Sequence, residues 1–593
     1  MQTRAFLWIM AGGSLLWTAS CSTLDGSAAA RRQAEAWRAE HRLIDLHQHV
    51  NCTTQHLTRA VKIMDAVGLG VAVNLGIGTV TPAQNGGLSQ FERNKHLTDT
   101  LFPGRFLHYM ELDYRNWDQP DFAVQAAQQI EKGRRLGAAG FKQSKALGLY
   151  VRDGQGKLVK VDDPKLDLMW AKCGELNLPV SIHVADPKAF WQPFDANNER
   201  WKELKDHKNW WFGDTNKFTP WKEMLEALNR VIVRHPKTTF VCVHFANNAE
   251  ELEWVDASLS RYPNMMADLA ARIPEIGRHD PEAVRRLFLK HQDRIFFGTD
   301  FMVYGRLILG SSGNEPPPTD ADAETFFAKE YRWLETLDKN WEHMTPIQGD
   351  WTISSIGLPA SVLRKIYFDN ARKLLAHSLP PPVARAARVE ADFTPDGKLS
   401  EPAWQRAPVA RLEYRGRDGA AMPELSTAVR ALWSDEFLYL AYECPFTRLT
   451  VFDPPLVGQK RYDMQKRGVS LWDRDVVEAF INSDPQKPGR YVEVQVAPTN
   501  ERLDLMVDLP GRDFAWNSGL ESAVKIDSTA RVWTCEMRIP LKSISAAKPQ
   551  AGARWRANFF RCDAAHQAGL AWSPPLVGNF HTPEKFGVLE FVK

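Results

Sequence analysis

Between residues 31 and 377, short apolar segments alternate with longer amphipathic stretches, and no other feature of the sequence constrains the fold as much. Eight apolar segments are predicted strands: residues 43–47, 71–75, 106–111, 139–142, 179–183, 240–244, 265–268 and 294–298. Helical stretches between them include residues 121–136, 165–176, 221–234 and 281–290. This alternation is typical of parallel α/β domains. Eight such units predict a (β/α)8 TIM-like barrel with insertions, and a doubly wound open sheet is the alternative.

Polar side chains stand at the ends of several predicted strands. Side chains alternate along a strand, so His47 and His49 project to the same face. His183, His244 and Asp300 each end or directly follow an apolar run. One such histidine alone is as readily a hydrogen-bonded core residue. A barrel, however, gathers these strand ends at one face, and imidazoles with a carboxylate there predict a metal site.

The ordered set His47-x-His49, His183, His244 and Gly298-Thr299-Asp300 resembles the amidohydrolase superfamily, in its amidohydrolase-related, decarboxylase-like branch. The resemblance covers about residues 40–377. It implies one divalent metal, most often zinc, bound by His47, His49, His183 and Asp300. It also implies that His244 polarises the substrate or assists proton transfer, and that Asp300 handles the proton of metal-bound water. Water on such a zinc site has a pKa lowered to about 7, which makes this chemistry reasonable at neutral pH.

Three basic residues lie near the same strand ends. Lys142 ends the fourth predicted strand, where binuclear members of the superfamily carry a carbamylated lysine that bridges two metals. Alternatively, Lys142 binds a substrate anion or forms a structural ion pair. Lys145 also lies close enough to face the pocket. Arg272 either holds a substrate carboxylate or lies on a helix surface, and Asp113 and Asp186 also follow strands.

Two connections after predicted strands are too long for plain turns. Residues 186–221 are rich in tryptophan, and residues 310–351 begin with a Gly/Ser/Pro-rich segment. In a barrel both connections lie on the active-site face. Loops of this length are usually lids or specificity walls, and a self-packed flap is the alternative for the Trp-rich one.

The character of the sequence changes after a proline-rich linker at residues 378–387. Short alternating strands follow, such as residues 438–443, 476–481, 491–496 and 532–539. This pattern predicts an all-β sandwich over residues 388–593. Only two of the 16 histidines, His566 and His581, follow the linker, so metal chemistry is expected in the first domain.

Three segments of this second domain, residues 396–404, 471–481 and 586–591, resemble carbohydrate-binding module family 9. In that family an aromatic pair clamps a sugar ring and polar side chains bond its hydroxyls. The resemblance places Trp472 and Glu478 at matching positions. Phe580 stands where a tryptophan is expected, and Gln495 where an arginine is expected. The alternative is a sandwich that has lost its ligand and only packs on the barrel.

Residues 1–20 have the pattern of an export signal, with Arg4 before an apolar run that is too short to span a membrane. The segment ending in Ala19-Ser20-Cys21 resembles a bacterial lipoprotein cleavage box. The resemblance implies a lipid anchor on Cys21, and Ser22 then favours the outer membrane, facing the periplasm or the cell surface. An ordinary cleaved signal is the alternative. No Cys-x-x-Cys occurs, and most remaining cysteines are expected to be buried free thiols.

The net charge of +2 and the lack of a basic run argue against a nucleic-acid partner. The expected function is that of an exported hydrolase, in which metal-activated water attacks an ester, lactone or amide of a small carbohydrate-derived substrate. Non-oxidative decarboxylation is the first alternative. A non-catalytic surface protein that binds carbohydrate is the second.

Overall fold

The computed structural model describes residues 27–311 and 316–593, so the predicted signal segment and Cys21 lie outside the described residues. The chain divides into two units, one ending at Leu379 and the other beginning at Pro380. Within the described ranges, no helix combines the length and the apolar composition needed to cross a membrane. All six cysteines there are free, and four of them are buried, as predicted: Cys173, Cys242, Cys444 and Cys535.

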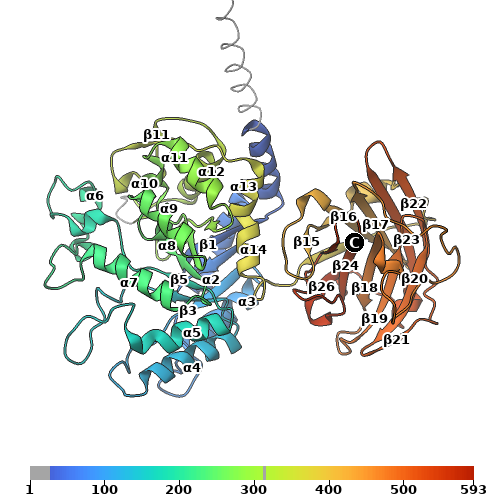
Figure 1. Cartoon of the computed structure of the whole chain (residues 1–593), viewed down its shortest axis with the longest axis horizontal. Coiled ribbons are helices and arrows are strands. Elements are labelled where there is room, and N and C mark those ends of the chain that lie inside the picture. Colours follow the sequence, from blue (N-terminus) through green and yellow to red (C-terminus); the bar gives the residue numbers. More distant parts are fainter. Residues whose placement is uncertain (1–26, 312–315) are drawn as a thin grey trace, which may run out of the picture. The chain divides into compact units, whose positions relative to one another are not determined.

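The first unit is a curled parallel sheet surrounded by helices, which confirms the predicted barrel-like α/β class (Figure 1). Its strands are β1 (Leu43–Val50), β2 (Leu69–Asn74), β3 (Phe106–Met110), β4 (Gly140–Gln143), β5 (Val180–Ile182), β6 (Phe240–Cys242), β7 (Met265–Asp268) and β8 (Ile295–Phe296). They pair in chain order. The Leu46 amide donates to the Phe297 carbonyl at 3.0 Å, and the Asp300 amide donates to the His47 carbonyl at 2.9 Å. These bonds bring the segment after β8 back to β1.

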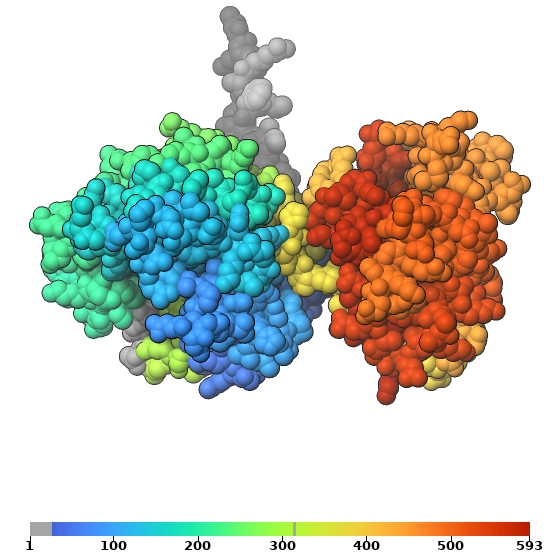
Figure 2. Space-filling model, turned by 90° about the horizontal axis from the view of Figure 1, so that it is seen from below, coloured from blue at the N-terminus to red at the C-terminus, as the bar shows by residue number. Residues whose placement is uncertain are grey.

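Helices cover the outside of the sheet (Figure 1), and Figure 2 shows the space-filling surface of the first unit in blue to green. They include α2 (Thr54–Val67), α3 (Gln90–Leu101), α4 (Phe122–Arg135), α5 (Asp167–Glu175), α7 (Trp221–Arg234), α9 (Leu252–Arg261) and α11 (Pro281–Lys290). In α7, Leu225, Leu228 and Ile232 recur at helical spacing and are buried, which fixes the face turned to the sheet. α2 ends at Gly68, whose φ of 81° favours glycine.

The two long connections differ in structure. The Trp-rich one contains only short helices, η2 (Lys188–Trp191), α6 (Trp201–Leu204) and η3 (Lys208–Trp210). The second is not the long loop that we expected, because it contains the 16-residue helix α12 (Asp320–Glu335). Thr319 and Asp322 form a capping box at its start, and Phe326, Phe327 and Trp333 are buried. Preceding it, β9 (Phe301–Val303) pairs with β1 and with β10 (Leu307–Leu309).

The second unit is the predicted β-sandwich. Its strands are β13 (Val383–Arg388), β14 (Val409–Leu412), β15 (Tyr414–Arg415), β16 (Thr427–Trp433), β17 (Phe437–Pro445), β18 (Val476–Asn482), β19 (Arg490–Val496), β20 (Arg502–Asp508), β21 (Gly511–Asp513), β22 (Glu521–Asp527), β23 (Val532–Pro540), β24 (Arg554–Asp563), β25 (Ala568–Ala571) and β26 (Gly587–Val592). Val383 already pairs with Val588, so this sheet begins within the stretch that we predicted as linker. The strands β21, β20, β19, β18 and β24 lie side by side in that order.

Candidate functional site

A cavity of about 430 Å³ lies at the carboxyl ends of the barrel strands. It is lined by His47, His49, Lys142, Ser144, Lys145, His183, Asp186, Pro187, Phe190, Arg200, Glu203, Trp210, His244, Arg272, Asp300, Met302, Tyr304, Ile308, Gly310 and Ser311. The residues predicted for the barrel site therefore face one space, with a single exception. Asp113 does not, because it lines a separate polar cavity of about 550 Å³ with Arg115 and Lys132.

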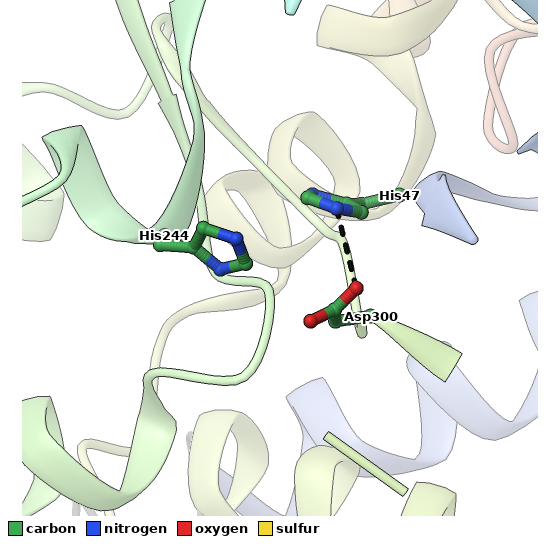
Figure 3. Close-up of side chains that lie close together, drawn as sticks. All are labelled: His47, His244 and Asp300. Atoms are coloured by element: carbon green, nitrogen blue, oxygen red, sulfur yellow. Dashed lines mark ion pairs between the residues drawn. The ribbon is translucent and has the colours of Figure 1, made fainter. Parts of the chain in front are cut away.

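His47, His244 and Asp300 form the tightest group in the cavity. One ligand atom of each lies within 4.8 Å of the others, and Figure 3 shows the two rings and the carboxylate around a common space. The His47 Nε2 atom is 3.3 Å from Asp300 Oδ1, and His49 Nε2 is 3.5 Å from the same oxygen. Histidine nitrogens and carboxylate oxygens at this spacing are a donor set that divalent metals bind.

His244 does not end a strand, as the sequence had led us to expect. β6 stops at Cys242, and four successive residues from His244 to Asn247 have a positive φ, which is 56° at His244. Asp300 also has a positive φ, of 59°. Non-glycine residues adopt this conformation only when their surroundings hold them there, and such positions cluster at functional sites. Here the Asp268 carboxylate accepts a hydrogen bond from the backbone N–H of His244 at 2.8 Å and helps to hold this conformation.

The Nδ1 atoms of three histidines each contact an oxygen acceptor: His47 contacts Asp268 at 2.9 Å, His49 the Leu75 carbonyl at 3.0 Å, and His244 the Ala270 carbonyl at 2.8 Å. A carbonyl only accepts, so Nδ1 of His49 and of His244 carries the hydrogen. Nε2 of each ring then keeps its lone pair and faces the cavity. Metal-binding histidines usually have this arrangement, which fixes both the tautomer and the orientation of the ring.

His183 lies at the edge of this group. Its ring centroid is 4.4 Å from that of His244, but its Nε2 is directed toward Asp186 Oδ1 at 3.3 Å. That Nε2 atom is buried and makes no hydrogen bond within the described residues. Of the predicted metal ligands, His47, His49 and Asp300 thus converge directly and His183 stands beside them. His244, which was expected to act on the substrate, belongs to the tightest group.

The protonation states suit metal binding. Burial lowers the pKa of His49 to about 3 and that of His183 to about 4, and it also lowers the pKa of His244 well below its ordinary value. These rings are therefore neutral at pH 7. Burial alone would raise the pKa of Asp300, but the neighbouring His47 outweighs it, so this pKa is well below its ordinary value. His47 differs: burial lowers its pKa, but the carboxylates of Asp268 and Asp300 outweigh burial and raise it above its ordinary value, so a metal would have to displace a proton from this ring. Neutral imidazoles and a carboxylate are the forms that bind metals.

Two buried cations in the cavity have no carboxylate partner within the described residues. The Nζ atom of Lys142 makes no hydrogen bond there, and burial lowers the pKa of Lys142 to about 8. The structural ion pair considered for Lys142 is therefore not found. Arg272 is 8% exposed and donates one hydrogen bond, from Nη1 to the Ala271 carbonyl at 2.9 Å, so it does not lie on a helix surface. Lys145, in contrast, is paired with Asp186.

The Trp-rich connection supplies one wall of the cavity through Phe190 and Trp210. The Trp210 ring stacks on His207 at a centroid distance of 4.2 Å. Behind this wall, the fully buried Arg200 pairs with Glu203 and Glu275. The connection is therefore held to the barrel by a buried ionic network.

Asp268 is a site residue that the sequence reasoning missed. It ends β7, binds the His47 ring through one oxygen and the His244 amide through the other, and is fully buried. Like the selected histidines, it is a polar residue at the end of an apolar strand, and that signal could have found it.

A second pocket, of about 340 Å³, lies on the sandwich. It is lined by Met464, Trp472, Glu478, Phe480, Glu493, Gln495, Leu505, Arg512, Phe514, Cys562, Gly578, Asn579, Phe580 and His581. The four residues predicted for sugar binding, Trp472, Glu478, Gln495 and Phe580, are brought together here. The sequence reasoning missed Glu493, Arg512, Phe514 and His581.

Residues 112–376 match the family model described as amidohydrolase, and residues 396–593 match the one described as carbohydrate family 9 binding domain-like. An "extracellular protein" from Arthroderma benhamiae is 28% identical over 188 residues, covering 29% of this chain and 80% of that protein.

Two solved structures are similar to one unit each. A family 9 carbohydrate-binding module from Caldicellulosiruptor kristjanssonii, in complex with cellotriose, is 14% identical, with a TM-score of 0.27, and the match covers 36% of this chain and 94% of that one. A dihydroxybenzoic acid decarboxylase from Polaromonas sp. JS666 is 14% identical, with a TM-score of 0.33, over 56% of this chain and 96% of that one. The family models thus make the chain similar to amidohydrolases over residues 112–376 and to carbohydrate family 9 binding-like domains over residues 396–593.

Proposed function

We propose that the barrel is a metal-dependent hydrolase that cleaves an ester, lactone or amide. One observation carries this proposal. His47, His49 and His244 are each held at Nδ1 by an oxygen, and ligand atoms of His47, His49 and His244 gather around the Asp300 carboxylate, with Nε2 of His47 and of His49 at 3.3 and 3.5 Å from Oδ1. A merely structural cluster would have no reason to gather three buried histidines around one carboxylate.

The donor set fits a single divalent metal, and its nitrogen-rich character suits zinc. His47, His49, His183 and Asp300 would hold it, as the family resemblance implies. Once bound, a metal of this kind supplies a Lewis acid and lowers the pKa of water. If Lys142 is carbamylated, a second metal can be held beside the first.

His244 and Asp300 would move the protons. The His244 Nδ1–H is committed to the Ala270 carbonyl, so a neutral His244 accepts a proton at Nε2 rather than donating one. Proton transfer is therefore the part of its expected role that this tautomer supports. Asp300 is ionised and lies between His47 and His49, so its carboxylate can orient an attacking water and accept its proton. Arg272 and Lys142 would bind a negatively charged group of the substrate.

A carbohydrate-derived substrate is proposed because a sugar-binding type of domain follows the barrel in the same chain, which is an argument from association. Trp472 and Phe580 would stack on a sugar ring, while Glu478 and Gln495 would bond its hydroxyls. A glycan array with the wild type and Trp472→Ala tests this role. Binding by neither protein would contradict it.

Non-oxidative decarboxylation is the second candidate, and Arg272 favours it. A buried guanidinium without an ion pair in the described chain is suited to a substrate carboxylate. The test is product analysis with metal-loaded protein on sugar lactones and esters, compared with aromatic and sugar acids. Release of an acid from lactones supports hydrolysis, whereas release of carbon dioxide from acids supports decarboxylation.

We also propose that the protein is exported and carries a lipid on Cys21, at the outer membrane. The support is the sequence of residues 1–21 alone. Mass spectrometry of the mature N-terminus tests this proposal, and an unmodified Cys21 or an uncleaved signal would contradict it.

A further inference from the structure

The sandwich pocket contains two buried carboxyl groups with which no lysine or arginine forms an ion pair in the described chain. Glu478 on β18 and Glu493 on β19 are 2% and 3% exposed. Glu478 is the cross-strand partner of Gln495, and Glu493 precedes Gln495 by two residues. Because side chains alternate along a strand, both carboxyls project from the same face of the sheet.

Groups from several elements face this pair. Cys562 on β24 donates a hydrogen bond to Glu478 Oε1 at 3.5 Å, and Gln495 donates one to Glu493 Oε1 at 2.7 Å. His581 Nε2 is 3.9 Å from Glu493 Oε2, and Arg512 on β21 lines the same pocket. The His581 Nδ1 atom is bonded to the Tyr491 hydroxyl at 2.7 Å. Two buried oxygens, Glu493 Oε2 and Gln495 Oε1, make no hydrogen bond within the described residues. These two oxygens can each accept a hydrogen bond from a ligand.

Among the residues that line the pocket, Arg512 is the one lysine or arginine. Burial, followed by the charge of Glu493, raises the pKa of Glu478, and burial also raises that of Glu493. Burial lowers the pKa of His581 to about 4, so this ring is neutral at pH 7. Ionising both buried carboxyls would place two negative charges beside the single positive charge of Arg512, which is unfavourable in free energy.

Aromatic rings surround the two carboxyls. Trp472, Phe480, Phe514 and Phe580 line the pocket. Phe514 stacks on Tyr462 at 4.0 Å and Phe580 stacks on Phe560 at 4.1 Å, so both rings are held in place from behind. Aromatic faces attract cations as well as sugar rings, and an ammonium group benefits from both kinds of neighbour.

We propose that this pocket binds an amino sugar in its protonated form, with the ammonium group at the carboxyls of Glu478 and Glu493 and the sugar ring against the aromatic side chains. This inference rests on the proposed role of the sandwich in carbohydrate binding. A neutral sugar adds no positive charge to the one that Arg512 brings to the two carboxyls. An ammonium group adds a second positive charge, donates to the unbonded Glu493 oxygen and favours ionisation of both carboxyls, so that a proton is released to solvent.

Calorimetric titration of the full chain at pH 7 tests the proposal with three probes: glucosamine, glucose and N-acetylglucosamine. The last has the same ring with an uncharged nitrogen. We expect glucosamine to bind about tenfold more tightly than either neutral sugar. Its binding enthalpy should differ between buffers of different ionisation enthalpy, because a proton is released. In Glu493→Gln, the affinity for glucosamine should fall to within about threefold of the affinity for glucose. Arg512→Ala should increase the affinity for glucosamine, because it removes a competing positive charge, and misfolding cannot produce such an increase.

The outcomes separate this inference from the proposal on which it rests. Equal binding of the three sugars, or tighter binding of glucose, overturns the amino-sugar preference and leaves the carbohydrate pocket intact. Binding of none of the three overturns both. Glucosamine binding that survives Trp472→Ala lies elsewhere in the chain and also overturns the inference.

Discussion

The Nδ1 atom of His47 lies 2.9 Å from Oδ2 of Asp268, and both side chains are almost completely buried. The other oxygen of Asp268 accepts the His244 amide at 2.8 Å. One carboxylate therefore orients two histidines of the barrel cavity. It makes Nδ1 of His47 a donor, so the lone pair of the neutral ring is on Nε2, which faces Asp300, and this is the form that a metal needs.

Asp268→Asn should weaken metal binding by about 10- to 100-fold, because an amide nitrogen in place of Oδ2 favours the wrong His47 tautomer. Metal affinity is measured by competition with a chelator of known affinity. Asp256→Asn is the matched control, since Asp256 binds the ring of His291 at 2.6 Å and neither residue lines the cavity. Equal losses in both variants, or none in Asp268→Asn, would contradict this role of Asp268.

Arg200→Met should destabilise the barrel by about 3–5 kcal/mol, because it leaves Glu203 and Glu275 buried without a cation. Thermal unfolding and urea denaturation measure the effect. Arg278→Met is the control, because Arg278 pairs with the half-exposed Glu199 and should cost less than about 1 kcal/mol. If the two variants lose the same stability, the Trp-rich connection is not held by the buried network.

Glu330→Gln should stabilise the protein at high pH and have little effect near pH 4. Burial, and then the nearby Asp45, raises the pKa of Glu330 well above its ordinary value, and its Oε2 atom has no hydrogen-bond partner among the described residues. The folded state therefore keeps Glu330 protonated, while the unfolded state ionises it above about pH 4.5. The resulting cost grows as pH rises from there toward the folded-state pKa.

The uncharged amide in the Glu330→Gln variant would carry no such cost, so we expect a gain of about 1–3 kcal/mol at pH 8 that disappears on acidification. Melting temperatures between pH 4 and pH 8 measure it. The exposed Glu324 on the same helix α12 provides the control variant Glu324→Gln. A gain in Glu330→Gln that does not change with pH would argue against a buried neutral carboxyl.

The sequence predicted the architecture and most of the barrel cavity because local patterns determine both. Alternation of apolar segments gave the eight barrel strands, and polar residues at their ends gave His47, His49, His183 and Asp300. The helix α12 was missed although its capping residues Thr319 and Asp322 are visible in the sequence. Glu493 was missed although it lies two residues from Gln495 on the same strand, and therefore on the same face.

Other features depend on contacts between distant segments and could not be read locally. The position of His244 follows from a left-handed turn after β6, which an oxygen of Asp268 stabilises from the next strand. The role of Asp268 itself depends on its contact with His47, which lies 221 residues away in the chain. Likewise, the absence of an ion pair at Arg272 in the described chain can be recognised only once its neighbours are placed.

The most direct test of the account is the metal content of the purified full chain after incubation with zinc and removal of excess ion. Mass spectrometry of the metals should find about one equivalent in the wild type and a large loss in His47→Ala and Asp300→Asn, which remove converging ligands. The control variant Asp256→Asn should retain its metal. Less than half an equivalent in the wild type, or equal content in all four proteins, would contradict the metal-dependent enzyme proposed here.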